Sequence, residues 1–304
     1  MSKKSILFIF LLLGLYSPTS CAQLTRSQYK SITEGKDASV GVAVVCGKMK
    51  SAFRNDIHYP LMSVVKFPVA VCALKKMECE GDSVARMVTL SPNQLHDGTY
   101  SPLRSEHPDG WAMVSIRQIQ DYALRLSDNN ACDWLIDYCG GIERVDTFVR
   151  SLGIKGFKLT QTEAQMHEDI FRCYLNSAHP MDVANLFEKV FSGGVISKDH
   201  LALIEQSMTK TATGNNKLKA DFPRTLTFVH KTGHSDRYIK PTDSGASAFG
   251  RMIGDCDAGF LILPNGRKRF VVVLIKDSAL SDGGNEQIFQ SMARSISQNL
   301  KLNE

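Results

Sequence analysis

Residues 63–66 read Ser63-Val64-Val65-Lys66, an S-x-x-K motif at the start of an apolar stretch with helical spacing. Residues three positions apart lie on the same face of a helix, so the Lys66 amine can reach the Ser63 hydroxyl. A serine hydroxyl is a poor nucleophile at neutral pH and needs a base beside it. The motif therefore predicts a nucleophilic serine at the start of a helix.

The motif alone is weak evidence, because residues 27–30 and 207–210 have the same spacing. Two tripeptides further along the chain favour Ser63. Ser127-Asp128-Asn129 and Lys231-Thr232-Gly233 each occur once and follow Ser63 in this order. Taken separately, the first resembles a helix N-cap and the second a strand end with a glycine turn. The three motifs in order predict a single catalytic site.

The remaining pattern predicts the fold class. Strands are predicted at residues 39–46, 52–57, 226–231, 246–253, 259–263 and 269–276, with a hairpin turn at Pro264-Asn265-Gly266. Helices are predicted at residues 24–35, 64–77, 116–126, 131–138, 142–152, 180–191 and 284–300. Because strands occur only at the two ends of the chain, we predict an α/β (α+β) fold with one antiparallel sheet. Terminal helices would cover one face of the sheet, and an all-helical lobe would cover the other.

The first 22 residues are expected to be a secretory signal, which predicts a periplasmic protein. Lys3 and Lys4 precede an apolar run at residues 6–16. This run is shorter than the roughly 20 apolar residues that span a membrane. Signal peptidase could cut after Ala22, or Cys21 could become the lipidated first residue of a lipoprotein. Pro18 stands where lipidation signals normally have leucine, which favours ordinary cleavage.

Residues 23–304 are expected to form a single domain and a monomer. Its α/β lobe would comprise about residues 23–62 and 211–304, and its helical lobe about residues 63–210. A site is expected where the lobes meet. The chain has 304 residues, 43% of them hydrophobic, and a net charge of +5 without a dense Lys/Arg run. This charge pattern gives no reason to expect a nucleic-acid partner.

Cysteine and histidine spacing argues against a metal site. The eight cysteines lie at positions 21, 46, 72, 79, 132, 139, 173 and 256, and no C-x-x-C motif occurs. His230 and His234 fall on a predicted strand and turn, where residues four apart are about 13 Å apart. We therefore predict no metal and no cofactor. Export would permit disulfides, but the sequence leaves their pairing open.

A further stretch gives a family resemblance. Thr162-Glu163-Ala164-Gln165-Met166-His167 lies between the two tripeptides, with Tyr100-Ser101-Pro102 upstream and Lys276-Asp277-Ser278 downstream. Together with the motifs, these residues resemble the class A serine β-lactamases, in particular the PER, VEB and CfxA branch. The resemblance covers essentially the whole mature chain. It implies the serine β-lactamase/DD-peptidase-like fold, hydrolysis of penicillins and cephalosporins, and antibiotic resistance.

The resemblance also implies catalytic roles. Ser63 would attack the lactam carbonyl, and its base would be either Lys66 as a free amine or Glu163 acting through water. Backbone N–H groups of Ser63 and His234 would form the oxyanion hole. Ser127 would pass a proton to the leaving lactam nitrogen. Glu163 would then activate the water that cleaves the acyl-enzyme.

Further residues are assigned to substrate binding by the same resemblance. Asn129 would hold the amide side chain of the substrate, and Lys231 and Thr232 its carboxylate. Tyr100 would line the entrance of the cleft or pack as a loop aromatic. The remaining substrate-binding residues are expected to be Gly233, His167, Lys217 and Ser235.

Several positions depart from the family pattern. His234 stands where many relatives have a small or hydroxyl residue, and His167 where many have an asparagine that orients the water. Gln161 and Asn176 replace the usual Arg–Asp pair of the omega loop. Residues 236–248 form a longer turn than in relatives, which predicts an added flap beside the cleft.

Lys217 is the candidate for the carboxylate-binding role that many relatives give to an arginine. A lysine lacks the bidentate fork of arginine. A solvated surface lysine is the alternative interpretation of this position.

Two other functions share the same fold and acylation chemistry. One is a D-alanyl-D-alanine peptidase or penicillin-binding protein, and the other a penicillin-binding sensor that deacylates slowly. Glu163 argues against the first, because penicillin-binding proteins lack this glutamate. Carbapenem hydrolysis is not predicted, since Met62 and Ser235 stand where some carbapenem-hydrolysing relatives have a cysteine pair.

Overall fold

The computed structural model describes residues 18–239 and 250–300. Its centre is an antiparallel sheet in the order β2-β1-β10-β9-β7, with β8 paired to β9. The strands are β1 (Ser39–Cys46), β2 (Met49–Phe53), β7 (Thr227–His234), β8 (Arg237–Tyr238), β9 (Arg251–Ile262) and β10 (Lys268–Ser278). As predicted, the first and last strands of the chain form one sheet, with Val42 opposite Val273.

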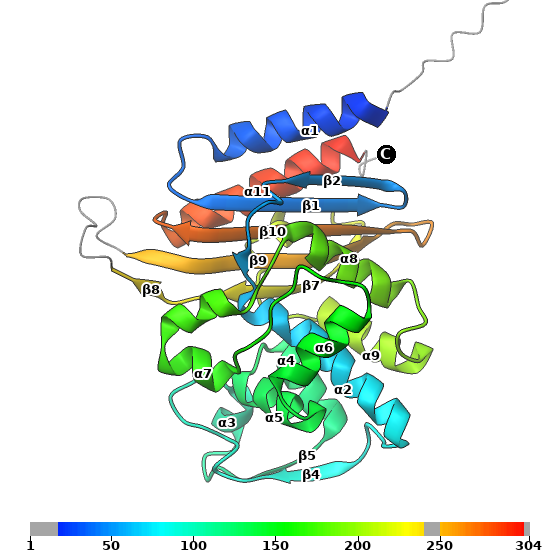
Figure 1. Ribbon diagram of the computed structural model, residues 1–304, viewed down its shortest axis with the longest axis vertical. Helices are drawn as coiled ribbons and strands as arrows, with labels where there is room; N and C mark the ends of the chain where they lie inside the picture. Colours follow the sequence, from blue (N-terminus) through cyan, green and yellow to red (C-terminus); the bar gives the residue numbers. More distant parts are fainter. Residues whose placement is uncertain (1–17, 240–249, 301–304) are drawn as a thin grey trace, which may run out of the picture.

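The two faces of the sheet belong to two separate cores. Val40, Val42 and Val44 of β1 pack into one core, and Ala43 and Val45 into the other. This alternation follows from the two-residue period of a strand. Helices α1 (Pro18–Thr33) and α11 (Asp282–Asn299) cover the first face, as predicted (Figure 1).

A helical lobe covers the other face of the sheet, as predicted (Figure 1). It contains a 3-10 turn η1 (Met62–Val65) and the helices α2 (Lys66–Glu80), α3 (Pro102–Glu106), α4 (Ile116–Arg125), α5 (Asn129–Cys139), α6 (Ile142–Ser151), α7 (Glu163–Glu168), η2 (Ile170–Leu175), α8 (Pro180–Phe191) and α9 (Lys198–Thr209). The short helix α10 (Leu218–Asp221) packs with α11 on the first face instead. Phe67 of α2 stacks on Phe187 of α8 at 4.0 Å, and Phe191 meets Phe260 of β9 at 4.4 Å. Aromatic side chains thus join the lobes.

Three details of the strand prediction are wrong. Of the strand predicted at residues 246–253, residues 246–249 lie outside the described residues. The remainder and the strand predicted at 259–263 are not two strands, because residues 251–262 are a single strand, β9, buried along nearly its whole length. A strand covered on both faces shows no polar alternation that would mark its continuity. The hairpin partner of β1 starts at Met49 rather than at residue 52, because the turn contains only two residues, Gly47 and Lys48.

The third error concerns strands outside the main sheet. β3 (Tyr59–Pro60) pairs with β6 (Ser177–Ala178), and β4 (Met87–Leu90) pairs with β5 (Ala112–Ser115). These strands are too short to give a pattern in the sequence. The pair β3–β6 matters for the site, because it fixes both the segment before Ser63 and the segment after α7.

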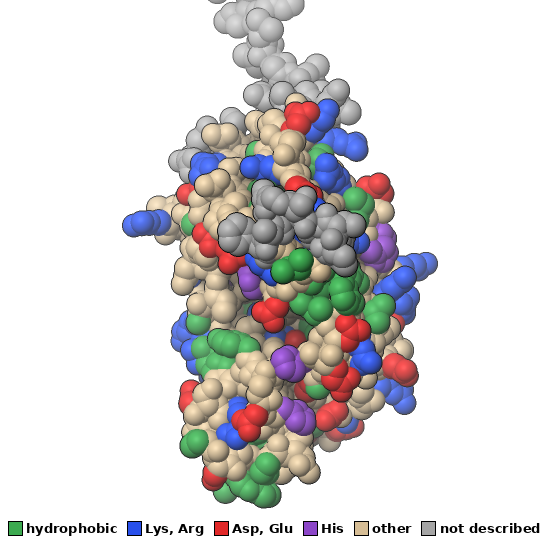
Figure 2. Space-filling view, turned by 90° about the vertical axis from the view of Figure 1, so that its left-hand side faces the viewer, with side chains coloured by type: hydrophobic (Ala, Val, Ile, Leu, Met, Phe, Trp, Pro, Cys, Tyr) green, Lys and Arg blue, Asp and Glu red, His purple; other side chains and the backbone are tan. Residues whose placement is uncertain are grey.

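The remaining surface adds two observations. The face that carries β8 and α7 has acidic, basic and histidine side chains interspersed (Figure 2).

Within residues 18–239 and 250–300, no helix is both long enough and apolar enough to cross a bilayer.

Candidate active site

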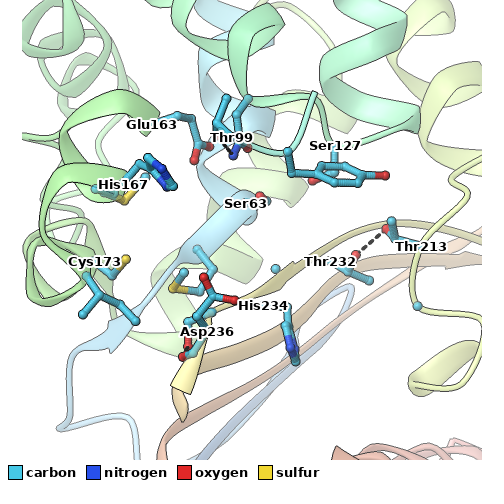
Figure 3. Close-up of a pocket in the computed structure, with 18 of the residues that line it drawn as sticks. Ser63, Thr99, Ser127, Glu163, His167, Cys173, Thr213, Thr232, His234 and Asp236 are labelled. Carbon is cyan, nitrogen blue, oxygen red and sulfur yellow. Dashed lines mark hydrogen bonds between the residues drawn. The ribbon is translucent and has the colours of Figure 1, made fainter. Parts of the chain in front are cut away.

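A pocket of about 670 Å³ lies where the helical lobe meets the edge strand β7. Most of the predicted site residues line it, namely Ser63, Tyr100, Ser127, Asn129, Glu163, His167, Lys217, Thr232, Gly233, His234 and Ser235. Glu163, Ser127 and Thr232 surround Ser63 in the close-up (Figure 3). Lys66 and Lys231 are fully buried beside them. The structure therefore brings the predicted set together.

The backbone around Ser63 is tightly fixed. Met62, directly before it, has a φ of 46°, which is unusual for a residue with a side chain. Gly233 of β7 lies so close that a Cβ there would be 2.6 Å from Met62 Cβ and 2.8 Å from Ser63 N. Glycine is therefore required at this position, and it places β7 against the nucleophile.

Lys66 joins three polar residues below the pocket. Its ammonium donates to Ser63 Oγ and Asn129 Oδ1, each at 2.7 Å, and lies 2.8 Å from Glu163 Oε1. Burial alone would lower the pKa of Lys66, but the Glu163 carboxylate outweighs burial, and the pKa is raised. The Glu163 carboxylate therefore favours the ammonium form of Lys66.

The pKa of Lys231 is shifted in the opposite direction from that of Lys66. Its amine donates to Ser127 Oγ and to Thr232 O, both at 2.8 Å. Burial, and then the charge of Lys66, lower the pKa of Lys231 well below its ordinary value. The hydroxyl of Thr232 is 2.5 Å from that of Thr213, a residue that the sequence did not indicate.

The tripeptide Ser127-Asp128-Asn129 is both a helix N-cap and a part of the site. Asp128 is the N-cap of α5, as a capping residue would be, and it also accepts from Ser101 Oγ and Leu103 N. Ser127 and Asn129 lie on either side of it and face the pocket. The backbone of Ser127 has a φ of 62°, which residues other than glycine rarely adopt. The N-cap at Asp128 fixes this backbone conformation and so orients the Ser127 hydroxyl.

Tyr100 lies at the rim of the pocket. It is 58% exposed, and its carbonyl accepts from the backbone N–H of Asn129 at 3.0 Å. The exposed ring shows that Tyr100 is not a packed loop aromatic.

The omega loop, the segment between Gln161 and Asn176, is fixed at Glu163, the first residue of α7. Thr162 and Gln165 form a capping box. Asp133 of α5 accepts from the N–H groups of Glu163 at 2.7 Å and Ala164 at 2.8 Å. Burial, and then the charge of Glu163, raise the pKa of Asp133 to about 7. Asp133 was missed in the sequence, although it lies four residues after Asn129 and therefore on the same helix face.

The two ends of this loop, at Thr160–Gln161 and at Asn176, are held together without an Arg–Asp pair, and this junction is called the neck. Asn176 is fully buried, and its Oδ1 accepts from Thr160 N at 2.8 Å and Gln161 N at 3.0 Å. Its Nδ2 donates to Gln161 O at 2.8 Å. One neutral amide therefore supplies three hydrogen bonds across the neck.

One of the two interpretations of Lys217 is corrected. Lys217 is only 7% exposed, so it is not a solvated surface lysine. Its ammonium donates to Gly233 O, Asp255 Oδ1 and Cys256 O. Lys217 also lines the pocket, so its binding of the substrate carboxylate stays a prediction. Burial opposes ionisation of Asp255, but Lys217 holds the pKa of Asp255 below its ordinary value.

His234 shares the Asp255 carboxylate with Lys217. Its side chain is 52% exposed, and its Nδ1 lies 3.6 Å from Asp255 Oδ1. The strand β7 extends through His234 rather than ending at Lys231, because residues 227–234 pair with β9 throughout. Residues 240–248 of the expected flap lie outside the described residues. In the described part of the chain, no three His, Cys, Asp or Glu side chains form a group that could hold a metal ion.

Comparison with known proteins identifies the family. Residues 25–300 match the model of the β-lactamase enzyme family. The chain is 36% identical over 273 residues to a β-lactamase of Bacteroides uniformis, and the alignment covers 89% of each chain. The crystal structure of a class A β-lactamase from Bacteroides cellulosilyticus matches with a TM-score of 0.86 and 35% identity, over 93% of this chain and 98% of that one. The chain belongs to the class A β-lactamases.

This class A β-lactamase also has relatives in the predicted branch. It is 30% identical over 99% of its length to VEB-1 of Pseudomonas aeruginosa, whose chain is likewise covered to 99%. The extended-spectrum β-lactamase PER-1 of the same organism is 30% identical over 93% of this chain and 89% of its own. The predicted family, fold class and serine β-lactamase function are confirmed, and the peptidase and sensor alternatives are not favoured.

Proposed function

We propose that this class A β-lactamase hydrolyses penicillins and cephalosporins through an acyl-enzyme on Ser63, with Glu163 as the general base. The observation that carries the proposal is the position of Lys66. This single ammonium donates a hydrogen bond to Ser63 Oγ and forms an ion pair with Glu163 Oε1, so nucleophile and base contact the same group. A nucleophilic serine and a carboxylate that contact the same ammonium can serve in both acylation and deacylation.

In acylation, Ser63 Oγ attacks the lactam carbonyl, and its proton leaves through water to Glu163. In its ammonium form, which the Glu163 carboxylate favours, Lys66 cannot take that proton, so Glu163 is favoured between the two candidate bases. The backbone N–H groups of Ser63 and His234 would stabilise the oxyanion. Close packing of Gly233 against Ser63 supports this, because it brings β7 beside the nucleophile.

The lactam C–N bond then breaks, and its nitrogen needs a proton. Ser127 Oγ lines the pocket and is the proton donor in this proposal. Lys231 donates to the Ser127 oxygen, which stabilises negative charge on it after the transfer. Before deacylation, the proton that Glu163 accepted returns through solvent to Ser127, so that Glu163 is again a carboxylate and Ser127 a neutral hydroxyl. Glu163 then removes a proton from the water that attacks the ester, and this proton passes to Ser63 Oγ as the ester C–O bond breaks, which regenerates Ser63.

Substrate binding is assigned to the rest of the pocket. Asn129 would hold the amide side chain of the substrate, with Tyr100 and His167 at the rim. The substrate carboxylate would meet Lys231, Thr232 and the neighbouring Thr213 hydroxyl. Lys217 also acts indirectly in this proposal: it holds Gly233 O and Asp255 beneath the carboxylate site.

A turnover and mass experiment tests the assignment. With a chromogenic cephalosporin, Glu163→Gln should accumulate an acyl-enzyme that is visible by intact mass, whereas Ser63→Ala should form none. Ser27→Ala is the matched control, because Ser27 belongs to another S-x-x-K match and is exposed. It should turn over substrate like the unaltered enzyme. An adduct on Ser63→Ala, or fast deacylation by Glu163→Gln, would refute the roles of these two residues.

We further propose export to the periplasm as a monomer, with cleavage after Ala22. The charged, apolar and small-residue order of the first 22 residues supports export. Cell fractionation and N-terminal sequencing of the mature protein test this proposal. A lipid-modified N-terminus at Cys21, abolished by Cys21→Ser, would show lipoprotein processing instead.

A further inference from the structure

A histidine and an aspartate form a fully buried pair between two strands of the main sheet. His230 of β7 and Asp257 of β9 have no exposed surface, and His230 Nδ1 lies 2.7 Å from Asp257 Oδ1. A carboxylate offers only acceptors, so the histidine donates in this bond. The pair therefore links the edge strand β7 to its neighbour β9 through side chains as well as through the backbone.

The other carboxylate oxygen of Asp257 holds a second part of the chain. Asp257 Oδ2 accepts from the backbone N–H of Leu218, the first residue of α10, at 3.2 Å. Leu218 directly follows Lys217, whose ammonium donates to Gly233 O of β7 at 3.0 Å. One buried carboxylate thus joins β7 to residues 213–218, which we call the bridging segment.

The bridging segment lies directly against β7. A Cβ at Gly214 would be 2.3 Å from Thr232 Cγ2 and 3.6 Å from His230 Cε1, so only a glycine fits here. Gly214 also has a φ of 75°, which favours glycine. Next to it, the Thr213 hydroxyl lies 2.5 Å from the Thr232 hydroxyl at the wall of the pocket (Figure 3). The position of Thr213 therefore depends on how closely the bridging segment is held to β7.

Packing alone does not explain the pair. Neither His230 nor Asp257 lines the pocket, so neither is a catalytic residue. Among the described residues, His230 Nε2 is buried without a hydrogen-bond partner, and such an atom costs stability. An apolar ring would fill the same space without this cost. What the histidine adds is the bond from Nδ1 to Asp257.

We propose that His230 and Asp257 are positioning residues for the site that binds the substrate carboxylate. This inference rests on the proposed function, which assigns the carboxylate to Lys231, Thr232 and Thr213. With the pair intact, the hydroxyls of Thr213 and Thr232 meet at one place. Without it, the Leu218 N–H loses its acceptor or the acceptor loses its support, and the bridging segment moves away from β7.

Benzylpenicillin and its methyl ester test the proposal, because the ester has no negative charge for the carboxylate site to bind. The unaltered enzyme should hydrolyse the acid with the higher kcat/KM. In Asp257→Asn and in His230→Phe, kcat/KM for the acid should fall about tenfold, mainly through KM, as expected when a hydrogen bond to a charged group is weakened. The value for the ester should stay the same, so the acid-to-ester ratio falls.

Two further variants separate positioning from a general loss of stability. Glu78 is the matched control, because its carboxylate accepts from His200 Nδ1 at 2.8 Å and from Ser197 N at 2.6 Å, outside the pocket. Glu78→Gln should therefore keep the acid-to-ester ratio. His230→Asn keeps a side-chain N–H donor for Asp257 and should restore most of the ratio that His230→Phe loses.

The outcomes distinguish failure of the site from failure of the positioning role. Equal kcat/KM for the acid and the ester in the unaltered enzyme would refute the carboxylate site, and the positioning role with it. An unchanged ratio in folded Asp257→Asn and His230→Phe, or an equal fall for both substrates, would overturn the positioning role alone.

Hydrogen exchange gives a readout that needs no variant. In the unaltered enzyme, NMR should show the Leu218 amide strongly protected, because Asp257 accepts its N–H inside the fold. Rapid exchange of this amide would overturn the proposal even if the variants fail to fold.

Discussion

Lys66 has no exposed surface and yet its charged form is favoured, because a carboxylate, a hydroxyl and an amide oxygen surround its ammonium. Asp133, which accepts from the N–H groups of Glu163 and Ala164, is a carboxylate that burial and Glu163 make harder to ionise. The charge balance of the site thus depends on residues beyond the motifs. Asp133 is the clearest case for an experiment.

Asp133→Asn should reduce the pH dependence of stability. The folded-state pKa of Asp133 is raised to about 7, whereas an unfolded aspartate has a pKa of about 3.9. Between these values the folded state binds more protons than the unfolded one, so this group makes the enzyme less stable as pH rises. The asparagine side chain does not titrate, so the substitution removes that slope while keeping an oxygen acceptor for the Glu163 N–H.

Urea unfolding at pH 5, 6 and 7.5 would measure the effect of Asp133→Asn. Asp137→Asn, which alters an exposed carboxylate on the same helix, is the control and should keep the slope of the unaltered enzyme. Identical slopes in all three proteins would mean that Asp133 does not titrate in this range.

Gly233→Ala should impair acylation strongly. The added Cβ would lie 2.6 Å from Met62 Cβ and 2.8 Å from Ser63 N, so the nucleophile must shift. Misplacement of a reacting group by about 1 Å costs roughly 100-fold in rate, which is the expected fall in kcat/KM. Gly283→Ala is the control, since nothing lies within 4 Å of its Cβ. An unchanged kcat/KM in Gly233→Ala would contradict the required close approach.

The spacing of the S-x-x-K motif predicts the nucleophile and its lysine, whereas the family resemblance implies the proton donor and the glutamate. Asp133, Asp255 and Thr213 are single residues without such a pattern, and only the fold brings them to the site. The alternative of a solvated surface lysine at Lys217 was wrong for the same reason. Its carboxylate partner lies 38 positions away in the sequence.

At the scale of elements, the omega loop depends on one amide. Asn176→Ala removes three hydrogen bonds and leaves the N–H groups of Thr160 and Gln161 without their acceptor. An unsatisfied buried group costs about 1–3 kcal/mol, so we expect a loss of about 2 kcal/mol in the free energy of unfolding. Deacylation should slow as well, because the loop carries Glu163.

Denaturant unfolding and single-turnover kinetics would measure both effects. Gln161→Ala is the matched control, since the Gln161 side chain bonds only to Thr160 and is not buried. If Asn176→Ala and Gln161→Ala behave alike, the neck does not depend on Asn176.

The long elements follow from local patterns, whereas the short ones depend on the assembled fold. Helix α8 has the predicted bounds because its apolar residues recur at the helical period, and strand β1 because it is a short run rich in β-branched residues. The two-residue strands β3 and β6 exist only because the chain on both sides is already positioned.

At the scale of the whole molecule, the two hydrophobic cores on either side of the sheet contribute differently to stability and to catalysis. Met292 of α11 is fully buried in the core on the face of the sheet away from the helical lobe. Met292→Ala should lower the free energy of unfolding by about 3 kcal/mol, as expected for a large-to-small core substitution. The kcat of the folded enzyme should not change, because Met292 does not line the catalytic pocket.

Urea unfolding and turnover assays would check this separation. The exposed Gln298→Ala on the same helix should alter neither stability nor kcat. A large fall in kcat for folded Met292→Ala would show that the two cores are coupled.

The strand order has a consequence for synthesis. β1 pairs with β10, so an early segment of the chain needs a late one before the sheet can close. While the ribosome is still at work, β1 has an unsatisfied edge, and the helical lobe has no sheet to pack against. Such distant pairing delays folding until the C-terminal strands have emerged. For a protein exported as proposed, that delay keeps the nascent chain open enough to thread through a secretion channel.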